Sequence, residues 1–422
     1  MLDLKFIRDN PDKVRWAIQV KHVDLDLDEL LEADRKALDF DKQITALNTE
    51  SNANSKKMGK ATLEERTSII ERGRQIRAEI ETLTPQRDAA KDNLQKLLLE
   101  VPNIPAEDAP IGKSEDENIE IKRWGEIPSF DFTPLDHVQI LENHGWAEFE
   151  RVAKVAGSRS YSLRNEAVFL EMAILRFAME KLRSKGFTLS SFPAMARDFA
   201  FLGQGMFPKA KDQVYYVDED DIYLAGTSEV ILNSLHKDEI LNESDLPLLY
   251  GGYSACFRRE AGSSGRDVRG LIRVHQFLKV EQYILCKNDP AESERWHNQL
   301  LTTSEEILQA LEIPYQVVAC CTGDMGLGKY RMNDINSWVP SEGKYRETHS
   351  CSNLTDWQAR RTNLRYRDAE DGKVKFCHTL NNTAIATPRV LVPFLENHQQ
   401  ADGSIRIPAA LQPYMGGATR LG

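Results

Sequence analysis

Side chains able to bind a phosphate-rich ligand are concentrated between Phe257 and Glu281, in the segment FRREAGSSGRDVRGLIRVHQFLKVE. Arg258 and Glu260 are two residues apart, so they would share one face of a strand. A guanidinium binds phosphate, and a carboxylate accepts a hydrogen bond from an exocyclic amine. The ring of Phe277 could stack on a base. These residues predict a nucleotide site, and the alternative is an exposed antiparallel hairpin with solvated charges.

The element expected to position these groups is a strand over 271–281. Alternation places Arg273, His275, Phe277, Lys279 and Glu281 on one face and apolar side chains on the other. The segment 261–267 before it contains two glycines, and its length is typical of a mobile loop that closes over a ligand.

Two later segments add groups of the same kind. Glu347 and Ser350 are three residues apart, and their hard oxygens suit Mg²⁺ held between phosphates. A helix start with Ser350 as its cap is the alternative for this segment. Arg389 follows Pro388 at the expected start of an apolar helix, where the helix dipole and its own charge both favour an anion.

These segments resemble one known family. Phe257-Arg258-Arg259-Glu260 followed by GLIRVHQF resembles motif 2 of class II aminoacyl-tRNA synthetases, and the surrounding sequence resembles bacterial seryl-tRNA synthetases. The helical pattern over 164–185 with the following strand and Pro193 resembles motif 1, which forms a dimer interface in that family. The block 379–417 resembles motif 3. The resemblance covers essentially the whole chain.

The resemblance implies an enzyme that uses ATP to form seryl-adenylate and then transfers the seryl group to tRNA(Ser), with tRNA(Sec) left open as a second acceptor. It implies that Arg258 holds the α-phosphate, Arg389 the γ-phosphate, and Glu347 with Ser350 the Mg²⁺. Adenine is expected at Glu260 and Phe277, with the Val274 backbone lining the same pocket. The residues expected around serine are Thr227, Glu229, Glu281, Asn381 and Thr383.

Departures from the family pattern are small. Ser228 stands where members more commonly have alanine, and Thr348-His349 stand where they usually have two small residues. Asn382 replaces a frequent glycine, whereas Thr383 keeps the hydroxyl.

Composition and charge argue against several other classes of protein. The chain has 422 residues, 41% hydrophobic content and a net charge of −11, which argues against general nucleic-acid binding. There is no apolar run of membrane-spanning length and the N-terminus is too charged for a signal peptide, so we expect a cytoplasmic protein. The six cysteines show no zinc-site spacing and are expected to be reduced.

The N-terminal part has heptad periodicity. Leu30, Ala37 and Ile44 recur every seven residues, and the pattern returns after Gly59 with Ile69, Ile76 and further residues. Thr62 and Glu65 form a predicted capping box at the start of the second helix. The pattern predicts an antiparallel helical hairpin over about 28–100.

The tip of this hairpin is basic. Residues 56–77 contain seven lysines and arginines and three glutamates, a local net charge of +4. A solvated helical face is the plain interpretation, but the resemblance implies that the hairpin binds the long variable arm of tRNA. The residues expected to contact tRNA are Lys56, Lys57, Lys60, Arg72 and Arg74.

The prediction for the whole chain is an α+β protein. A tRNA-binding domain over 1–110 would carry the coiled-coil arm, and a class II catalytic domain over 111–422 would contain an antiparallel β-sheet flanked by helices. Two alternatives remain. A ligase that loads amino acids onto carrier proteins would lack the long hairpin, and a non-catalytic RNA-binding relative would have lost Arg258, Glu347 or Arg389.

Overall fold

The computed structural model describes residues 1–262 and 269–422. The chain divides into two units, Met1–Pro102 and Asn103–Gly422. The sequence placed the division near residue 110. It lies earlier because residues 103–110 are hydrogen-bonded within the larger unit, where Asn103 N–H donates to the Leu327 carbonyl and Thr322 N–H donates to the Pro110 carbonyl.

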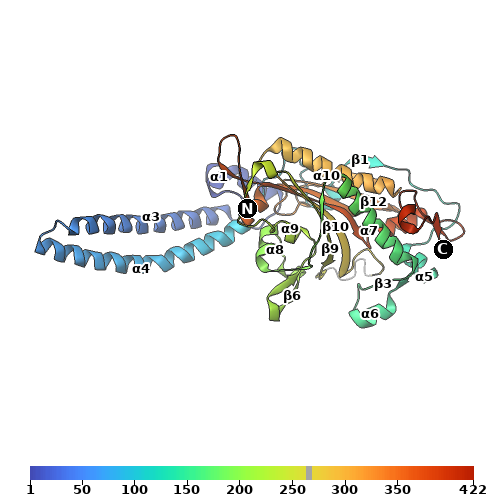
Figure 1. Cartoon of the computed structure of the whole chain (residues 1–422), viewed down its shortest axis with the longest axis horizontal. Helices are drawn as coiled ribbons and strands as arrows, with labels where there is room; N and C mark the ends of the chain where they lie inside the picture. The colour runs from blue at the N-terminus through green and yellow to red at the C-terminus, as the bar shows by residue number, and fades with distance from the viewer. Residues whose placement is uncertain (263–268) are drawn as a thin grey trace. The chain divides into compact units, whose positions relative to one another are not determined.

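The smaller unit is dominated by two long antiparallel helices, α3 (Leu27–Met58) and α4 (Leu63–Leu99), which lie side by side in Figure 1. Two short helices precede them, α1 (Leu4–Asp9) and α2 (Pro11–Val20). The heptad side chains Leu30, Ala37 and Ile44 are buried, as is Ile76 on the return helix. The predicted capping box between Thr62 and Glu65 is present, so the hairpin prediction is confirmed.

An eight-stranded sheet organises the larger unit. Its strand order is β1-β11-β12-β13-β16-β10-β9-β4, and every neighbouring pair is antiparallel except β4 with β9. In that order the strands span Ile119–Trp124, Tyr315–Ala319, Arg331–Val339, Lys344–Thr355, His378–Thr387, Gln276–Cys286, Leu248–Phe257 and Thr188–Ser191. The predicted α+β class with an antiparallel central sheet is confirmed.

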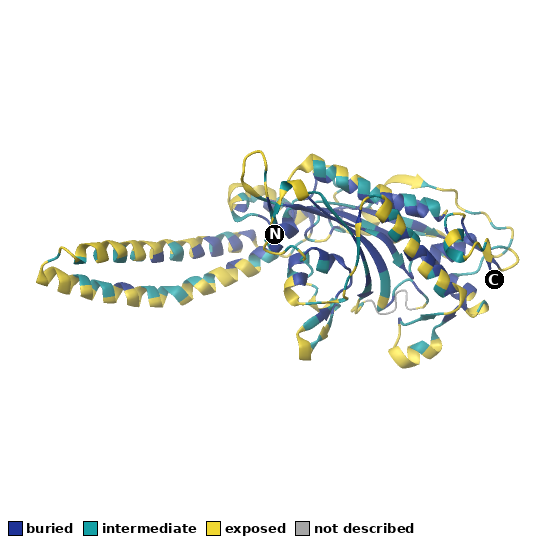
Figure 2. Cartoon of the chain, in the orientation of Figure 1, coloured by how far each residue is buried: buried dark blue, intermediate teal, exposed yellow. Residues whose placement is uncertain are grey.

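Helices α7 (Glu166–Ser184), α10 (Pro290–Ala310) and α12 (Leu391–His398) pack on the sheet. They contribute Leu170, Leu300 and Leu395 to a core that also contains Val280 and Ile284 of β10. Figure 2 shows the strands largely buried and the outer helix surfaces exposed. Since α7 and β4 match the motif 1 prediction in position, the sequence located this helix and strand correctly.

Two expected strand boundaries were wrong. β10 begins at Gln276 rather than 271, and β9 ends at Phe257, so Arg258 and Glu260 follow the strand instead of lying on it. Both strands end there because Gln276 and Phe257 form the last pair between β9 and β10. The residues before Gln276 and after Phe257 are not paired in this ladder. Glu260 has a positive φ of 52°, which no regular strand allows. Most of the predicted 261–267 loop lies outside the described residues.

No helix in the described ranges combines the length and the apolar character that crossing a bilayer requires. All six cysteines are free and buried.

Candidate active site

Alternation along β10 separates a core face from a site face. Gln282 points to α10, where its amide donates to the Leu300 carbonyl (3.2 Å) and the Ser304 hydroxyl (3.0 Å). Phe277, Lys279 and Glu281 belong to the opposite set of positions. These three side chains therefore lie on one face of β10, as predicted. The strand itself begins later than predicted.

One pocket brings together most of the residues expected to bind ATP. Its lining includes Arg258, Glu260, Val274, Phe277, Glu347, Thr383 and Arg389, together with Lys279. Ser350 is not among the residues that line it. The segments come from β9–β10, β13 and β16, which are far apart in the chain and adjacent in the sheet.

Arg258 directly follows β9, and its backbone is hydrogen-bonded to His275. Its N–H donates to the His275 carbonyl (2.9 Å), and its guanidinium lies over the Phe277 ring at 5.2 Å from the centroid. A Cβ added to Gly226 would lie 3.3 Å from Arg258 Cγ, so a small residue is needed there. The side chain of Arg258 is exposed and can reorient toward an anion.

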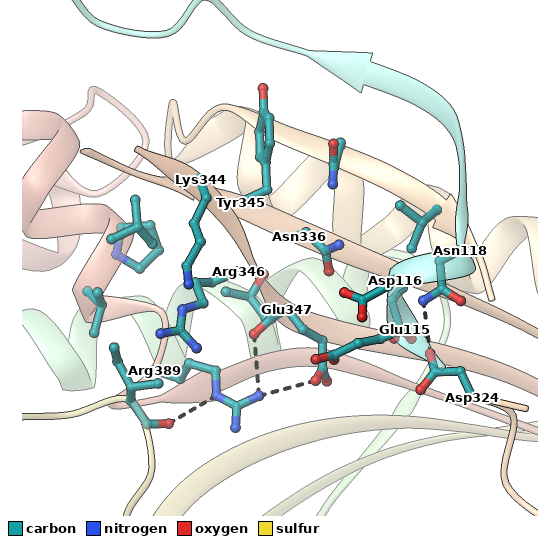
Figure 3. A pocket seen from close by; sticks show the side chains of 18 of the residues that line it. Glu115, Asp116, Asn118, Asp324, Asn336, Lys344, Tyr345, Arg346, Glu347 and Arg389 are labelled. Carbon is teal, nitrogen blue, oxygen red and sulfur yellow. Dashed lines mark hydrogen bonds and ion pairs between the residues drawn. The ribbon is translucent and has the colours of Figure 1, made fainter. Parts of the chain in front are cut away.

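Glu260 and Arg389 each have a charged neighbour in the pocket. Glu260 Oε2 accepts from Arg273 Nη1 at 2.9 Å. Arg389 Nη1 lies 3.6 Å from Glu347 Oε2 and donates to the Glu347 carbonyl at 3.3 Å, as Figure 3 shows. Arg389 precedes α12 by two residues, in the turn after Pro388, so it lies just before the helix and not in its first turn.

Glu347 and Ser350 lie on one strand, β13, which excludes the helix-cap alternative. Residues three apart on a regular strand face opposite sides. Here a β-bulge inserts Thr348, because Asn336 pairs with Glu347 while Ile335 pairs with His349. Asp334 pairs with Ser350, two residues from Asn336, so Glu347 and Ser350 face the same side.

His349, a departure from the family pattern, is buried and hydrogen-bonded. Its Nε2–H donates to the Ala384 carbonyl at 3.1 Å, and its Nδ1 accepts from the Thr348 hydroxyl at 2.9 Å. Burial lowers the pKa of His349 to about 4, so the ring is neutral at pH 7. His349 is therefore fixed between β13 and β16, whereas Thr348 lines the pocket beside Glu347.

Asp334 is a buried carboxyl that the sequence reading missed. It is 7% exposed, and burial together with the Glu347 carboxylate raises its pKa to about 8, while a hydrogen bond with Ser350 opposes this shift. The sequence around it, MNDINSW, reads as an ordinary strand. Only the pairing of β12 with β13 places Asp334 beside Glu347 and Ser350.

The residues expected around serine form a buried polar cluster. Glu281 accepts hydrogen bonds from the Asn381 amide (3.2 Å) and the Thr227 hydroxyl (3.5 Å). Glu229 joins through its backbone N–H, which donates to Thr227 Oγ1 (3.2 Å), and its carboxylate accepts from Gln358 (2.8 Å). Four of the five expected residues are therefore linked.

Lys279 connects this cluster to the pocket, and it was absent from the predicted site residues. Its Nζ lies 2.5 Å from Glu281 Oε2 and 2.7 Å from Thr227 Oγ1. The signal was its position two residues before Glu281 on the same strand face. The Ser228 hydroxyl donates to the Gly252 carbonyl at 3.4 Å. Asn382 points away, toward the Leu300 carbonyl (2.8 Å).

In the helical hairpin, the basic residues differ in their contacts. Lys56, Lys57 and Lys60 are exposed near the tip. Arg72 instead bridges the two helices, with its guanidinium at 2.7 Å from Glu50 and 2.8 Å from Glu79. Arg74 lies 3.8 Å from Glu71 and remains 73% exposed.

Comparison with known proteins identifies both parts of the chain. Residues 1–105 match the family model of the seryl-tRNA synthetase N-terminal domain, and residues 213–398 match that of the tRNA synthetase class II core domain (G, H, P, S and T). The serine–tRNA ligase of Deinococcus radiodurans is 57% identical, with 100% of this chain and 99% of the relative covered. That of Pyrococcus horikoshii is 42% identical over 99% and 96% of the two chains.

The most similar solved structures that we compared belong to the same kind of enzyme as these relatives. The crystal structure of seryl-tRNA synthetase from P. horikoshii complexed with ATP has a TM-score of 0.93 and 41% identity, and it covers 100% of this chain and 99% of that one. The cytoplasmic serine–tRNA ligase of Naegleria fowleri in complex with AMP has a TM-score of 0.88 and 27% identity, over 100% and 98%. This chain belongs to the seryl-tRNA synthetase family of class II aminoacyl-tRNA synthetases.

Proposed function

We propose that this chain activates L-serine with ATP and transfers the seryl group to the 3′ end of tRNA(Ser). The observation that carries the proposal is one pocket, lined by Arg258 and Arg389, that adjoins a buried polar cluster around Glu281. Full-length similarity to serine–tRNA ligases supports it.

The first step joins serine to the nucleotide. A carboxylate oxygen of serine attacks the α-phosphorus of ATP, the bond to the bridging oxygen breaks, and pyrophosphate leaves. In the second step a terminal ribose hydroxyl of tRNA attacks the seryl carbonyl carbon and AMP leaves. Neither step needs a protein nucleophile, so the residues act by positioning and by offsetting charge.

Each side chain has a proposed role in that arrangement. Arg258 would bind the α-phosphate and Arg389 the γ-phosphate, with charge-assisted hydrogen bonds that strengthen as negative charge develops. Glu260 would accept from the adenine amine, and Phe277 would stack on the base. The Val274 backbone would close the same pocket. Arg258, Arg389 and Glu347 are the proposed catalytic residues.

Glu347 and Ser350 fit Mg²⁺. Both are oxygen donors, both face one side of β13 because of the Thr348 bulge, and the Glu347 side chain is 51% exposed toward the cavity. When bound, the ion would neutralise phosphate charge. The two residues would hold it, while the arginines orient the triphosphate.

Serine would lie against Thr227, Glu229, Glu281, Asn381 and Thr383. Asn381 is 6% exposed, and its Oδ1 has no hydrogen-bond partner among the described residues, so it is available to a ligand. A site that commits polar groups to a substrate hydroxyl rejects alanine, because those groups would stay buried and unpaired. Threonine would be excluded by shape, which discriminates less.

The helical hairpin would bind the acceptor RNA. The exposed lysines 56, 57 and 60 and Arg74 would contact phosphates, and Arg72 would hold α3 to α4 instead. We therefore assign tRNA binding to residues 1–102 and catalysis to 103–422. We also propose a cytoplasmic homodimer through α7, where Phe169 and Met172 are 65% and 60% exposed.

One assay tests the central claim. Amino-acid-dependent exchange of pyrophosphate into ATP should be fastest with serine when all amino acids are compared. A better substrate than serine would refute the specificity, and absence of exchange with every amino acid would favour a non-catalytic relative. Charging of purified tRNA then separates a tRNA ligase from a ligase acting on a carrier protein.

A further inference from the structure

Residues 271–273 line the proposed ATP pocket and lie before the start of β10, so the sheet ladder does not hold them. Two side chains of the pocket are bonded to this segment. Arg389 Nε donates to the Ile272 carbonyl at 3.3 Å, and Arg273 Nη1 donates to Glu260 Oε2 at 2.9 Å. The segment therefore helps to place the residue proposed for the γ-phosphate and the residue proposed for adenine.

A histidine side chain holds the start of this segment. The Leu271 N–H donates at 3.3 Å to Nε2 of His137, the first residue of α5 (His137–Asn143). Both residues are buried. Since Nε2 accepts this hydrogen bond, the ring proton is on Nδ1. His137 thus offers one acceptor, which Leu271 uses, and one donor.

The donor side of the ring is bonded to a buried carboxyl group on α12. His137 Nδ1–H donates to Glu396 Oε1 at 3.0 Å, and the His137 backbone N–H donates to the same oxygen at 2.9 Å. Glu396 Oε2 accepts from the Ser341 N–H at 2.9 Å, and Glu396 is 0% exposed. This contact selects the tautomer in which the other ring nitrogen can accept from Leu271.

The residue before Leu271 leaves room for the ring. Gly270 has a positive φ of 81°, and a Cβ built there would overlap His137 Nε2 and lie 2.7 Å from Val138 Cγ2. A residue with a side chain would therefore push the ring away from the Leu271 N–H. The glycine and the histidine together fix where the segment begins.

We propose that His137 is a positioning residue for ATP, which acts through the Leu271 N–H to hold residues 271–273 where Arg389 and Glu260 can bind the nucleotide. The inference rests on the proposed function. His137 is not among the residues that line the pocket, so its effect would pass through the backbone. The serine cluster around Glu281 lies on β10, which β9 and β16 hold by strand pairing, so serine binding should not depend on His137.

Two substitutions separate the two ring nitrogens. The amide of asparagine reaches the position of Nδ1, and the amide of glutamine reaches that of Nε2. His137→Asn therefore keeps the donor toward Glu396 and leaves the Leu271 N–H without a partner, whereas His137→Gln keeps an acceptor for Leu271.

Serine-dependent exchange of pyrophosphate into ATP by the full chain measures the effect. His137→Asn should raise the KM for ATP about tenfold or more, and His137→Gln should raise it less than about threefold. The KM for serine should stay within about twofold in both variants, because a general loss of structure would change both constants. Titration calorimetry with ATP in the absence of serine should give the same order of affinities.

His144→Asn is the matched control, because His144 follows the last residue of the same helix and its Nε2 donates to the Gly403 carbonyl at 2.9 Å. It should leave the KM for ATP unchanged. Thermal unfolding shows whether each variant is folded.

Three results would overturn the proposal. An unchanged KM for ATP in His137→Asn would show that the Leu271 contact has no effect on ATP. A rise in His137→Gln as large as that in His137→Asn would assign the effect to Glu396, and failure of His137→Asn to fold would assign His137 to the fold instead. If the parent chain binds ATP but shows no serine-dependent exchange, the proposed function fails, and calorimetry with ATP still decides the role of His137.

Discussion

The contact between Lys279 and Glu281 gives the sharpest prediction. Their side chains are 7% and 1% exposed and 2.5 Å apart. Lys279→Met would leave the Glu281 carboxylate buried with only the Asn381 amide and Thr227 hydroxyl as partners. Removing one member of a buried ion pair costs about 3–5 kcal/mol. We expect a loss of that size in the free energy of unfolding.

The double variant Lys279→Met with Glu281→Gln separates stability from function. It removes the unpaired charge, so most of the lost stability should return, to within about 1–2 kcal/mol of the parent. Serine activation should not return, because the carboxylate that would bind the substrate ammonium is gone. The KM for serine should therefore rise far more than the KM for ATP.

Urea unfolding and serine-dependent pyrophosphate exchange measure the two effects. Lys287→Met is the matched control, since Lys287 is a 38% exposed lysine that pairs with Glu243 at 3.2 Å. A surface pair contributes only about 0–1 kcal/mol. The reasoning fails if Lys279→Met lowers the free energy of unfolding no more than Lys287→Met does. It also fails if the losses caused by Lys279→Met and Glu281→Gln add up in the double variant.

Three further predictions concern other parts of the chain. Arg258→Ala should slow adenylate formation about a hundredfold or more, a loss of roughly 2–4 kcal/mol in the transition state; near-normal exchange by the folded variant would remove the α-phosphate role. Deleting 35–95 and closing the gap with a short turn should preserve serine-dependent exchange and abolish tRNA charging, and efficient charging at physiological salt would refute the role of the hairpin. Stability should fall between pH 6.5 and 4, because burial lowers the pKa of His398 to about 4 and only the unfolded chain binds its proton there. That amounts to about 2 kcal/mol at pH 5 for this residue, and His398→Gln should flatten the urea-unfolding profile by that amount.

Local patterns were enough to predict much of this protein. Heptad spacing predicted the hairpin of α3 and α4, and a capping pair predicted where α4 begins. Alternation placed Phe277 and Glu281 on one strand face, because successive side chains of a strand without a bulge point to opposite faces. The class II motifs supplied the candidate residues for ATP and serine, and most of them lie in one pocket and the polar cluster beside it, although Ser350 does not line the pocket.

Long-range pairing decided the rest. The Thr348 bulge, which brings Glu347 and Ser350 to one side, exists only through the register of β12 against β13. The same register places Asp334 beside Glu347 and Ser350. Likewise, nothing in the sequence distinguishes Arg72 from other basic residues of its helix. Its ion pair with Glu50 depends on how α3 packs against α4. Such contacts join residues distant in sequence, so their geometry follows from tertiary packing and not from local periodicity.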